Sequence, residues 1–504
     1  MGFLVNIAKT ILGFMIIIGT VGCNLPEKSL QSPTMAANEP TQDIQSTPIV
    51  AFPIHTYTLE SPLPTIDHPE VTIIPQPTEQ NIQPNNVFGI TLYSFDEAGG
   101  LDQAALAGAD WTRSGFIWSS IEPSPGDRFW DTNLEQGLIR AASSGVEPIM
   151  LIESTPIWAL KAGFSCGAVT EDRFPALAQF AYDLVKRYSV PPYNVRYWEL
   201  WNEPDVAQIL GCWGNPSDTE YYGGKYYGEM LKWVYPQIKL ADPWAQVLVG
   251  GLLLDCDPNN PPEGKDCLSA RFLNGILESG AGSYFDGVSF HSYDYYTGEA
   301  TYENGNWHSS SSTTGPASIA KTRYLRNVLS NYGFGQKYLV NTETAVIWGP
   351  NVMDPPCGAP PEEVPNIEVT KVYYVIQSYA VAVAEGWKAN IWYSAFGVRC
   401  SGLLNSDRSP KDGFYAFQFA RQKLGEAQFS RQISEYEGVM GYEYDTPGRK
   451  LWVVWSLDGQ AHTINLPGFP VEVNWVGEDG LPVRILSALS LTLESSPIFI
   501  EYEQ

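Results

Sequence analysis

Apolar runs and amphipathic segments alternate along the chain from residue 86 to about residue 425. The short apolar runs predict buried strands, and the longer stretches between them carry apolar residues at helical spacing. Strands are predicted over 86–93, 111–118, 147–154, 195–203, 246–254, 286–293, 338–345 and 389–395. Amphipathic helices are predicted over 173–188, 225–240, 269–279, 318–332, 370–386 and 411–425.

Eight buried strands that alternate with helices favour an α/β fold, a (β/α)8 TIM barrel over residues 85–425. A doubly wound open sheet is the alternative. That fold usually has a Gly-rich phosphate turn after its first strand, and the stretch GITLYSFDEAGG does not supply one. After residue 425 the pattern changes to short alternating strands with turn residues between them, so residues 426–504 are predicted to form a C-terminal all-β, sandwich-like module with an accessory role. Its strands are predicted over 436–444, 450–456, 461–467, 471–477, 481–486 and 491–503.

The first 84 residues predict export rather than folded structure. Residues 1–23 carry an early cation and a short apolar run that ends in T-V-G-C, which resembles a bacterial lipoprotein signal with Cys23 as the lipidated residue. An uncleaved anchor over residues 2–22 is the alternative, and it would place Lys9 in the membrane. Residues 24–84 are rich in Pro, Thr and Ser and predict a disordered tether. The expected location is the extracellular face of the bacterial cell envelope, with membrane contact only through the lipid.

Composition narrows the partners. The formal net charge of -26 disfavours nucleic acid, because phosphate backbones repel such a surface. The chain has 16 Trp and 28 Tyr, an aromatic content suited to ligands with both apolar faces and polar groups, although core packing explains many of these rings. The five His are scattered and no CxxC motif occurs, so no metal site and no cofactor are predicted.

Six cysteines remain when Cys23 is set aside, and an even number in an exported chain predicts disulfides. Several connectivities are possible, and free buried thiols are the alternative. The predicted fold favours three pairs: Cys166 with Cys212, Cys256 with Cys267, and Cys357 with Cys400.

Two glutamates mark the candidate chemistry. Glu203 ends the fourth predicted strand and Glu343 lies near the end of the seventh, so both are expected at the barrel mouth where all strand carboxyl ends meet. Such a pair can cleave a glycosidic bond, with one carboxylic acid protonating the leaving oxygen and the other carboxylate attacking the anomeric carbon. A structural ion pair is the alternative for each. Glu199 is expected deeper in the barrel as a structural residue, and Glu122 and Glu153 are rim candidates.

The motif WELWNEPD, followed by HSY and NTETA at later strand ends, resembles the clan of retaining (β/α)8 glycoside hydrolases. The stretches 116–131 and 220–251 are most similar to family 39, the β-xylosidase-like group, with family 5, the cellulase-like group, next. The resemblance covers residues 86–425. It implies that Glu203 is the acid/base, with a pKa raised by the neighbouring carboxylate, and that Glu343 is the nucleophile, roughly 5 Å away.

The same resemblance implies substrate-binding roles for further residues. Asn202 would bind the sugar 2-hydroxyl, Arg113 would support the ionised nucleophile, Tyr293 would orient Glu343, and His291 would line the same wall. Trp392 would form a platform beneath the sugar. Other aromatic residues are expected on the rim: Trp118, Trp158, Trp213, Tyr295, Tyr296 and Trp348. Family 5 members often have His at the end of the third strand, whereas this chain has Glu153 and Ser154, which favours family 39.

The sequence therefore predicts a retaining glycoside hydrolase that acts on β-glycosidic bonds of oligo- or polysaccharides and whose partner is a carbohydrate. Two alternatives remain. A non-catalytic glycan-binding surface lipoprotein would need the barrel and its aromatic residues but no carboxylate pair. A transglycosylase would use the same residues and differ only in its acceptor.

Overall fold

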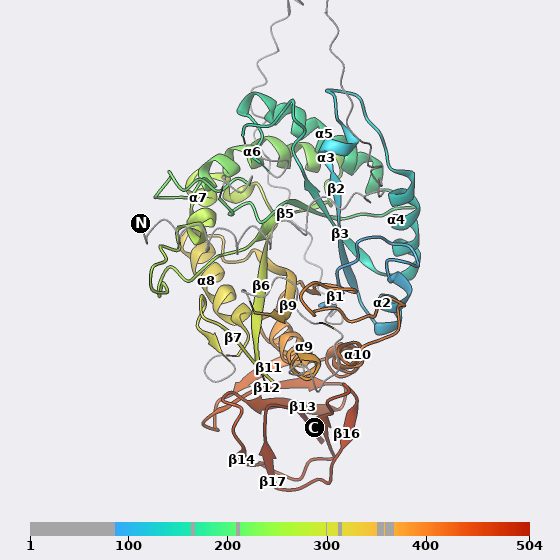
Figure 1. Cartoon of the computed structure of the whole chain (residues 1–504), viewed down its shortest axis with the longest axis vertical. Coiled ribbons are helices and arrows are strands. Elements are labelled where there is room, and N and C mark those ends of the chain that lie inside the picture. Colours follow the sequence, from blue (N-terminus) through green and yellow to red (C-terminus); the bar gives the residue numbers. More distant parts are fainter. Residues whose placement is uncertain are drawn as a thin grey trace, which may run out of the picture. The chain divides into compact units, whose positions relative to one another are not determined.

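A closed barrel of eight parallel strands forms the centre of the computed structural model, which describes residues 86–162, 167–207, 212–298, 300–310, 315–349, 357 and 367–503. The strand order is β5-β4-β3-β2-β1-β10-β9-β6, and pairing of β5 with β6 closes the barrel (Figure 1). Cys23, Cys166 and the predicted signal and tether lie outside the described residues. The barrel strands are β1 (Phe88–Ile90), β2 (Trp111–Ile117), β3 (Glu147–Glu153), β4 (Tyr197–Asn202), β5 (Gln246–Leu252), β6 (Gly287–Gly298), β9 (Tyr338–Trp348) and β10 (Ala389–Trp392).

Helices surround this barrel, as the amphipathic segments predict. Helix α4, which the predicted segments do not include, shows how such a helix is bounded: the Asp131 side chain accepts hydrogen bonds from the backbone N–H groups of Asn133 and Leu134, and Gly145 ends the helix in the left-handed region at φ 73°. The described helices are α2 (Leu101–Ala107), α3 (Trp118–Ile121), α4 (Thr132–Ser144), α5 (Phe174–Tyr188), α6 (Gly224–Ala241), α7 (Phe272–Glu278), α8 (Ala317–Asn331), α9 (Ile367–Ala384) and α10 (Asp412–Leu424). Within the described ranges, no helix combines the length and apolar character needed to cross a bilayer.

The barrel interior is apolar at the end where the strands begin. A buried cluster fills it, and its members alternate along their strands: Trp111, Ile149, Leu248, Val340, Ala389 and Ile391. Positions two and four residues further along the same strands therefore face the barrel axis at the opposite end, which is the mouth. The polar residues Arg113, Glu153 and Tyr393 occupy such positions.

Strand β6 is longer than predicted and continues beyond the barrel. Its last residues pair antiparallel with β7 (Thr301–Asn304), which pairs in turn with β8 (Ser309–Ser310). The Asn304 side chain donates a hydrogen bond of 2.7 Å to the backbone carbonyl of Tyr293. This extension fixes the end of β6, where predicted site residues lie.

The C-terminal part is all-β, as predicted. One antiparallel sheet has the order β11-β12-β13-β18-β15-β16, and β14 pairs with β17. The predicted strand over 491–503 is two strands, and β11 was not predicted because five of its six side chains are exposed or half-buried. The strands are β11 (Gln428–Ile433), β12 (Val439–Thr446), β13 (Arg449–Ser456), β14 (His462–Asn465), β15 (Glu472–Val476), β16 (Pro482–Arg484), β17 (Ser490–Leu493) and β18 (Ile498–Glu503).

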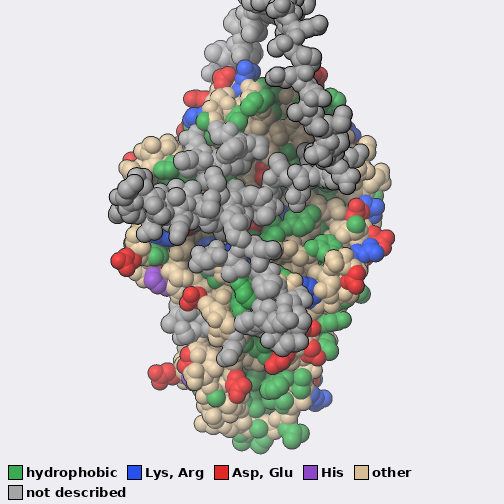
Figure 2. All heavy atoms as spheres, in the orientation of Figure 1, with side chains coloured by type: hydrophobic (Ala, Val, Ile, Leu, Met, Phe, Trp, Pro, Cys, Tyr) green, Lys and Arg blue, Asp and Glu red, His purple; other side chains and the backbone are tan. Residues whose placement is uncertain are grey.

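This module shares its core with the barrel helices. The Phe419 ring in α10 packs against Phe499 in β18 at 4.8 Å between centroids, and the Tyr444 hydroxyl donates to the Ala380 carbonyl in α9. Figure 2 shows hydrophobic side chains gathered on the surface of the module as well. Its exposed apolar side chains include Phe469, Trp475, Leu481 and Leu486.

Candidate active site

Glu203 is held at the end of β4 by an irregular backbone. Trp201 and Glu203 both have positive φ, 73° and 43°, and the Glu203 N–H donates a hydrogen bond of 2.9 Å to the Gly251 carbonyl on β5. Pro204 follows, and its missing N–H ends the regular strand pairing. This irregular end of β4 places Glu203 at the mouth, where its side chain is 12% exposed.

A β-bulge on β9 positions Glu343. Asn341 pairs with Phe290 and Glu343 with the next residue, His291, so β9 has one extra residue opposite β6. The pairing of β9 with β10 has the same irregularity. Both Thr342 and Glu343 therefore make contacts inside the barrel: Thr342 donates to Glu199 at 3.0 Å, and Glu343 accepts from Arg113 at 2.6 Å.

The two predicted catalytic carboxylates lie close together. One oxygen of Glu203, one oxygen of Glu343 and a ring nitrogen of His291 all lie within 4.8 Å of one another. Glycosidases that form a covalent intermediate have carboxyl groups about 5–5.5 Å apart, whereas inverting enzymes need about 6.5–9.5 Å to accommodate a water molecule. An approach of two carboxylate oxygens to within 4.8 Å is compatible with the shorter spacing.

Arg113 joins the carboxylates at the base of the site. Its Nε donates to Glu199 at 2.5 Å, its Nη1 to Glu343 at 2.6 Å and its Nη2 to Asn202 at 2.8 Å. Arg113 and Glu199 are buried, and Glu199 makes its contacts within the barrel, in agreement with the structural role predicted for it. Asn202 is half-buried beside Glu203, and its amide oxygen is already used by Arg113.

His291 contacts both glutamates. Its Nδ1 lies 2.9 Å from Glu203 Oε1 and 3.5 Å from Glu343 Oε2. Burial lowers the pKa of His291 to about 4, with the charges of Arg113 and Lys321 acting in the same direction against that of Glu343, so the ring is neutral near pH 7. Nε2 is buried against Gly251 and has no hydrogen-bond partner among the residues that the structure describes. The single ring proton therefore belongs on Nδ1, facing the carboxylates.

The Tyr293 hydroxyl donates a hydrogen bond to Glu343 Oε2. Burial, together with the charge of Glu343, raises the pKa of Tyr293, so the phenol keeps its proton and remains a donor. Arg113 and Tyr293 thus bind different oxygens of Glu343. A divalent cation could in principle use the ligand atoms of Glu203, His291 and Glu343, but it would compete with these two donors for Glu343.

Burial raises the pKa of Glu203 to about 7, while the positive charges of Arg113 and Lys321 oppose the shift. The cause predicted from the sequence, repulsion by the neighbouring carboxylate, was wrong. Loss of hydration is the effect that raises the Glu203 pKa. A carboxyl group with a pKa near 7 can donate a proton near neutral pH.

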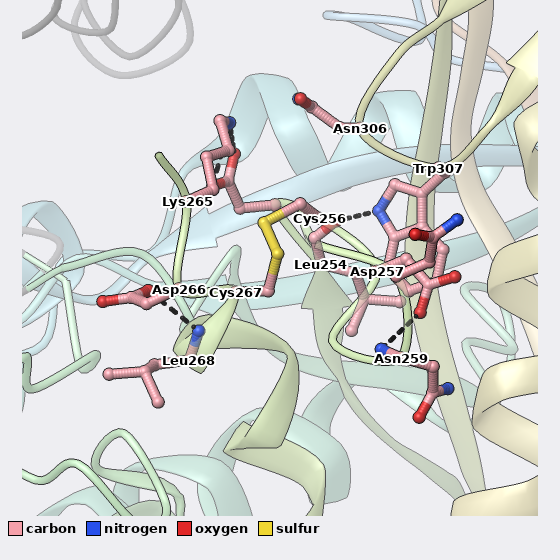
Figure 3. Close-up of a disulfide and its surroundings, with 12 residues drawn as sticks. Leu254, Cys256, Asp257, Asn259, Lys265, Asp266, Cys267, Leu268, Asn306 and Trp307 are labelled. Atoms are coloured by element: carbon pink, nitrogen blue, oxygen red, sulfur yellow. Dashed lines mark hydrogen bonds and ion pairs between the residues drawn. A yellow bond between two sulfur atoms is a disulfide. The ribbon is translucent and has the colours of Figure 1, made fainter. Parts of the chain in front are cut away.

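A buried polar layer behind Glu203 was not found from the sequence. Asp205 accepts hydrogen bonds from the backbone N–H groups of Leu253 and Leu254, and Lys321 on α8 donates to the carbonyls of Leu253 and His291. Figure 3 shows the surroundings of Leu254, where Trp307 donates to the Leu254 carbonyl beside the disulfide Cys256–Cys267. Asp205 is the last residue of the WELWNEPD motif, but the motif does not reveal its partners, and no motif marks Lys321, because both side chains bind backbone groups elsewhere in the chain.

Trp392 does not lie at the mouth, where it was expected as a platform. Trp392 is fully buried and faces the helices, where its indole N–H donates to the Ser401 carbonyl at 2.8 Å. The inward-facing residue is Tyr393, which follows Ala389 and Ile391 in the alternation. Its ring meets Tyr293 edge-on at 6.2 Å, and its hydroxyl accepts a hydrogen bond of 3.0 Å from the exposed Tyr93. Strand alternation counted from the barrel interior could have identified it.

Most of the predicted rim aromatics serve packing. Trp118 is fully buried and donates to Glu122 at 2.8 Å, and the half-buried Trp158 donates to the carbonyl of the same residue. The Glu122 carboxylate is further occupied by Arg128, so Trp118 and Glu122 form a structural group rather than a sugar-binding one. Trp213 and Tyr296 are buried, whereas Tyr295 and Trp348 are half-buried in the last parts of β6 and β9.

Two of the three predicted disulfides are present. Cys256 pairs with Cys267 after β5, and Cys357 pairs with Cys400, which joins the segment after β9 to the segment after β10. Both lie in connections that follow barrel strands, at the mouth. Cys212 is buried, and its predicted partner Cys166 lies outside the described residues, so that pair stays a prediction.

No family model matches the chain, and no curated protein matches it. Solved structures do match. A family 39 glycoside hydrolase from the gut symbiont Bacteroides cellulosilyticus aligns with a TM-score of 0.63 at 18% identity, covering 83% of this chain and 81% of that one. A family 30 endoxylanase from Clostridium papyrosolvens aligns at 0.56 and 13% identity, covering 84% and 97%. A family 39 β-xylosidase from Caulobacter crescentus aligns at 0.51 and 14% identity, with the same two coverages. The likeness shows a shared fold, of the kind that the sequence resemblance implies.

Proposed function

We propose that this protein is a retaining glycoside hydrolase that cleaves β-glycosidic bonds, with Glu343 as nucleophile and Glu203 as acid/base. The observation that carries the proposal is the placement of their carboxylate oxygens within 4.8 Å at the carboxyl ends of two barrel strands. Similarity in fold to family 39 and family 30 glycoside hydrolases supports it.

In the first step, Glu343 attacks the anomeric carbon and forms an ester bond while the bond to the leaving oxygen breaks. Glu203 gives its proton to that oxygen, a role that its pKa of about 7 suits. Arg113 donates a hydrogen bond to one oxygen of Glu343 and Tyr293 donates to the other, and these two contacts orient the carboxylate before the attack. In the second step, Glu203 takes a proton from water, water attacks the anomeric carbon, and the ester bond breaks to restore the Glu343 carboxylate.

Location is a second part of the proposal. Two disulfides support an oxidising compartment and therefore export. Attachment of lipid to Cys23 on the extracellular face of the cell envelope is the predicted means of membrane contact. Metabolic labelling with a radioactive fatty acid, compared between the wild-type protein and Cys23→Ala, tests this attachment.

The activity is tested with a panel of aryl β-glycosides and β-glycans, using the wild-type protein, Glu203→Ala and Glu343→Ala. Turnover that is lost in both folded variants supports the pair, and proton NMR then identifies the first-formed anomer. A β-anomer supports retention, and an α-anomer overturns it. Products that carry an added acceptor sugar identify a transglycosylase. Absence of turnover, together with glycan binding that both variants retain, identifies a glycan receptor and overturns the proposal.

A further inference from the structure

Glu153 is a third carboxyl group at the inner rim of the barrel mouth. It ends β3, where Ile149 in the interior cluster and Leu151 precede it on the same face of the strand. Its partner in strand pairing is Ile117, which is 36% exposed. Glu153 itself is half-buried at this position.

The Glu153 carboxyl group has no fixed partner in the described part of the chain. Arg113, the cation that acts on it, already uses its three nitrogens for Glu199, Glu343 and Asn202. Among the described residues, no side chain or backbone group donates a hydrogen bond to Glu153, in contrast to Glu122, which accepts from Trp118 and from the Gly126 N–H. A buried or half-buried carboxyl group that is structural usually has such donors.

The space beside Glu153 is kept open by a glycine. Gly115 is on the inward face of β2, and a Cβ atom there would lie 3.6 Å from Glu153 Oε1, so that any longer side chain would compete for the space around the carboxyl group. Burial raises the pKa of Glu153 to about 7, with Arg113 opposing the shift and the negative charges of Glu199 and Glu343 adding to it. Glu153 therefore lies within the electrostatic field of the proposed nucleophile.

We propose that Glu153 is a specificity-determining residue: it hydrogen-bonds hydroxyl groups of the sugar beside Glu343 and disfavours sugars that carry a carboxylate. This inference rests on the proposed function. A carboxylate accepts hydrogen bonds from neighbouring hydroxyls, and the sugar then supplies the donors that the protein lacks at this position. A uronic acid would instead bring a negative charge to a mouth that already contains Glu153, Glu203 and Glu343 with Arg113 as a shared cation, and such a like-charge encounter disfavours the wrong ligand.

The test compares kcat/KM for a 4-nitrophenyl β-glucoside and the matching β-glucuronide at pH 8, in the wild-type protein and Glu153→Gln. Methyl β-glucoside and methyl β-glucuronide are also compared as competitive inhibitors of the best neutral substrate. Glu171→Gln is the matched control, because Glu171 is exposed in the connection between β3 and α5. The wild-type protein should prefer the neutral sugar, and Glu153→Gln should shift the uronide-to-neutral ratio by about tenfold or more toward the uronide. Glu171→Gln should leave the ratio unchanged.

An unchanged ratio in Glu153→Gln, with turnover of a neutral substrate intact, overturns the inference and leaves the proposed function standing. A wild-type protein that prefers the uronide also overturns the inference and leaves the proposed function standing. If Glu153→Gln does not fold, the inhibition constants of the wild-type protein decide, since equal constants for the two methyl glycosides overturn the inference. Lack of turnover on every substrate overturns the proposed function, and the inference with it.

Discussion

Glu203 and Glu343 come from opposite walls of the barrel, and a single imidazole, that of His291, contacts both carboxylates. The two carboxylates nevertheless have different surroundings. Glu343 is bound by the cation Arg113 and the phenol of Tyr293, whereas burial raises the pKa of Glu203 to about 7. Different surroundings for two carboxyl groups are what separates the role of nucleophile from that of acid.

Loss of Glu203 should affect substrates according to their leaving groups. Glu203→Ala cannot protonate the leaving oxygen, so hydrolysis of an unactivated β-glycoside should fall by about 10²–10⁴-fold. The first step should be less affected for a dinitrophenyl glycoside, whose leaving group needs no proton. Added azide should restore turnover of that substrate and yield a glycosyl azide, measured by mass spectrometry. Equal losses on both substrates and no azide product would argue against the acid/base role.

The pH profile should reflect protonated Glu203. As pH rises through about 7, Glu203 loses its proton, and kcat/KM on a substrate with a poor leaving group should fall with the protonated fraction. Because Glu153 also has a pKa of about 7, Glu153→Gln is the matched control and should keep this decline. Residual activity of Glu203→Gln should lack it. If the fall in kcat/KM persists in Glu203→Gln and vanishes in Glu153→Gln, the pH dependence comes from Glu153 instead of Glu203.

Removal of Arg113 should destabilise the barrel. Arg113→Met leaves the buried carboxylates of Glu199 and Glu343 without their shared cation, and the free energy of unfolding should fall by about 3–5 kcal/mol. Arg187→Met is the control, because the Arg187 side chain is 40% exposed in its pair with Glu135 and should cost about 1 kcal/mol or less. Urea unfolding measures the free energy of unfolding of both variants. Equal decreases in the two variants would contradict the stabilising role of the buried contacts of Arg113.

Tyr393 and Trp392 should separate binding from stability. Tyr393→Leu should raise KM by about tenfold, since the inward ring lies beside Tyr293 at the mouth, and it should also lower the free energy of unfolding because that ring is 2% exposed. Trp392→Leu should leave KM near the wild-type value and lower the free energy of unfolding by about 3 kcal/mol, because a fully buried ring is removed. Steady-state kinetics and urea unfolding measure these effects. A raised KM in Trp392→Leu with an unchanged KM in Tyr393→Leu would show that Trp392 is the ring that contacts the sugar.

The disulfide Cys357–Cys400 should constrain the mouth more than Cys256–Cys267 does. The first closes a sequence separation of 43 residues and the second one of 11. Loop-closure entropy then predicts stabilisation of about 4 and about 3 kcal/mol, respectively. Replacing both cysteines of the first pair by Ser should also raise KM while far-UV circular dichroism stays unchanged. Loss of activity and of secondary structure together under mild reduction would show that the bond supports the whole barrel.

The barrel could be predicted because its strands are buried on both faces and therefore read as apolar runs. The observed strands lie within or close to the predicted ranges, with β6 as the main exception: its extension into β7 depends on pairing beyond the barrel rather than on an apolar pattern. Strand β11 was missed for a similar reason, since its mostly accessible side chains give no signal of burial.

The site residues that lie in strand-end motifs could be predicted from the sequence. Those whose position depends on contacts in the folded chain could not. Glu203, Glu343, Arg113, His291 and Tyr293 come together as expected, because strand carboxyl ends share one mouth. Trp392 was expected at the mouth because its strand was not counted from the interior residues Ala389 and Ile391, whose alternation places Trp392 on the outer face. Asp205 and Lys321 bind backbone groups that are remote in sequence, so their contacts could not be read from the residues around them.

Arg113 also restricts how this chain can change over evolutionary time. Its three nitrogens connect β2 to two positions of β4 and one of β9, so a substitution at any of these positions affects both folding and the candidate chemistry. Selection for a folded barrel would therefore preserve the central residues even while substrates change. Descendants with new sugar preferences should differ first at Glu153, Ile117 and the connections after the strands, where a replacement leaves the guanidinium contacts intact.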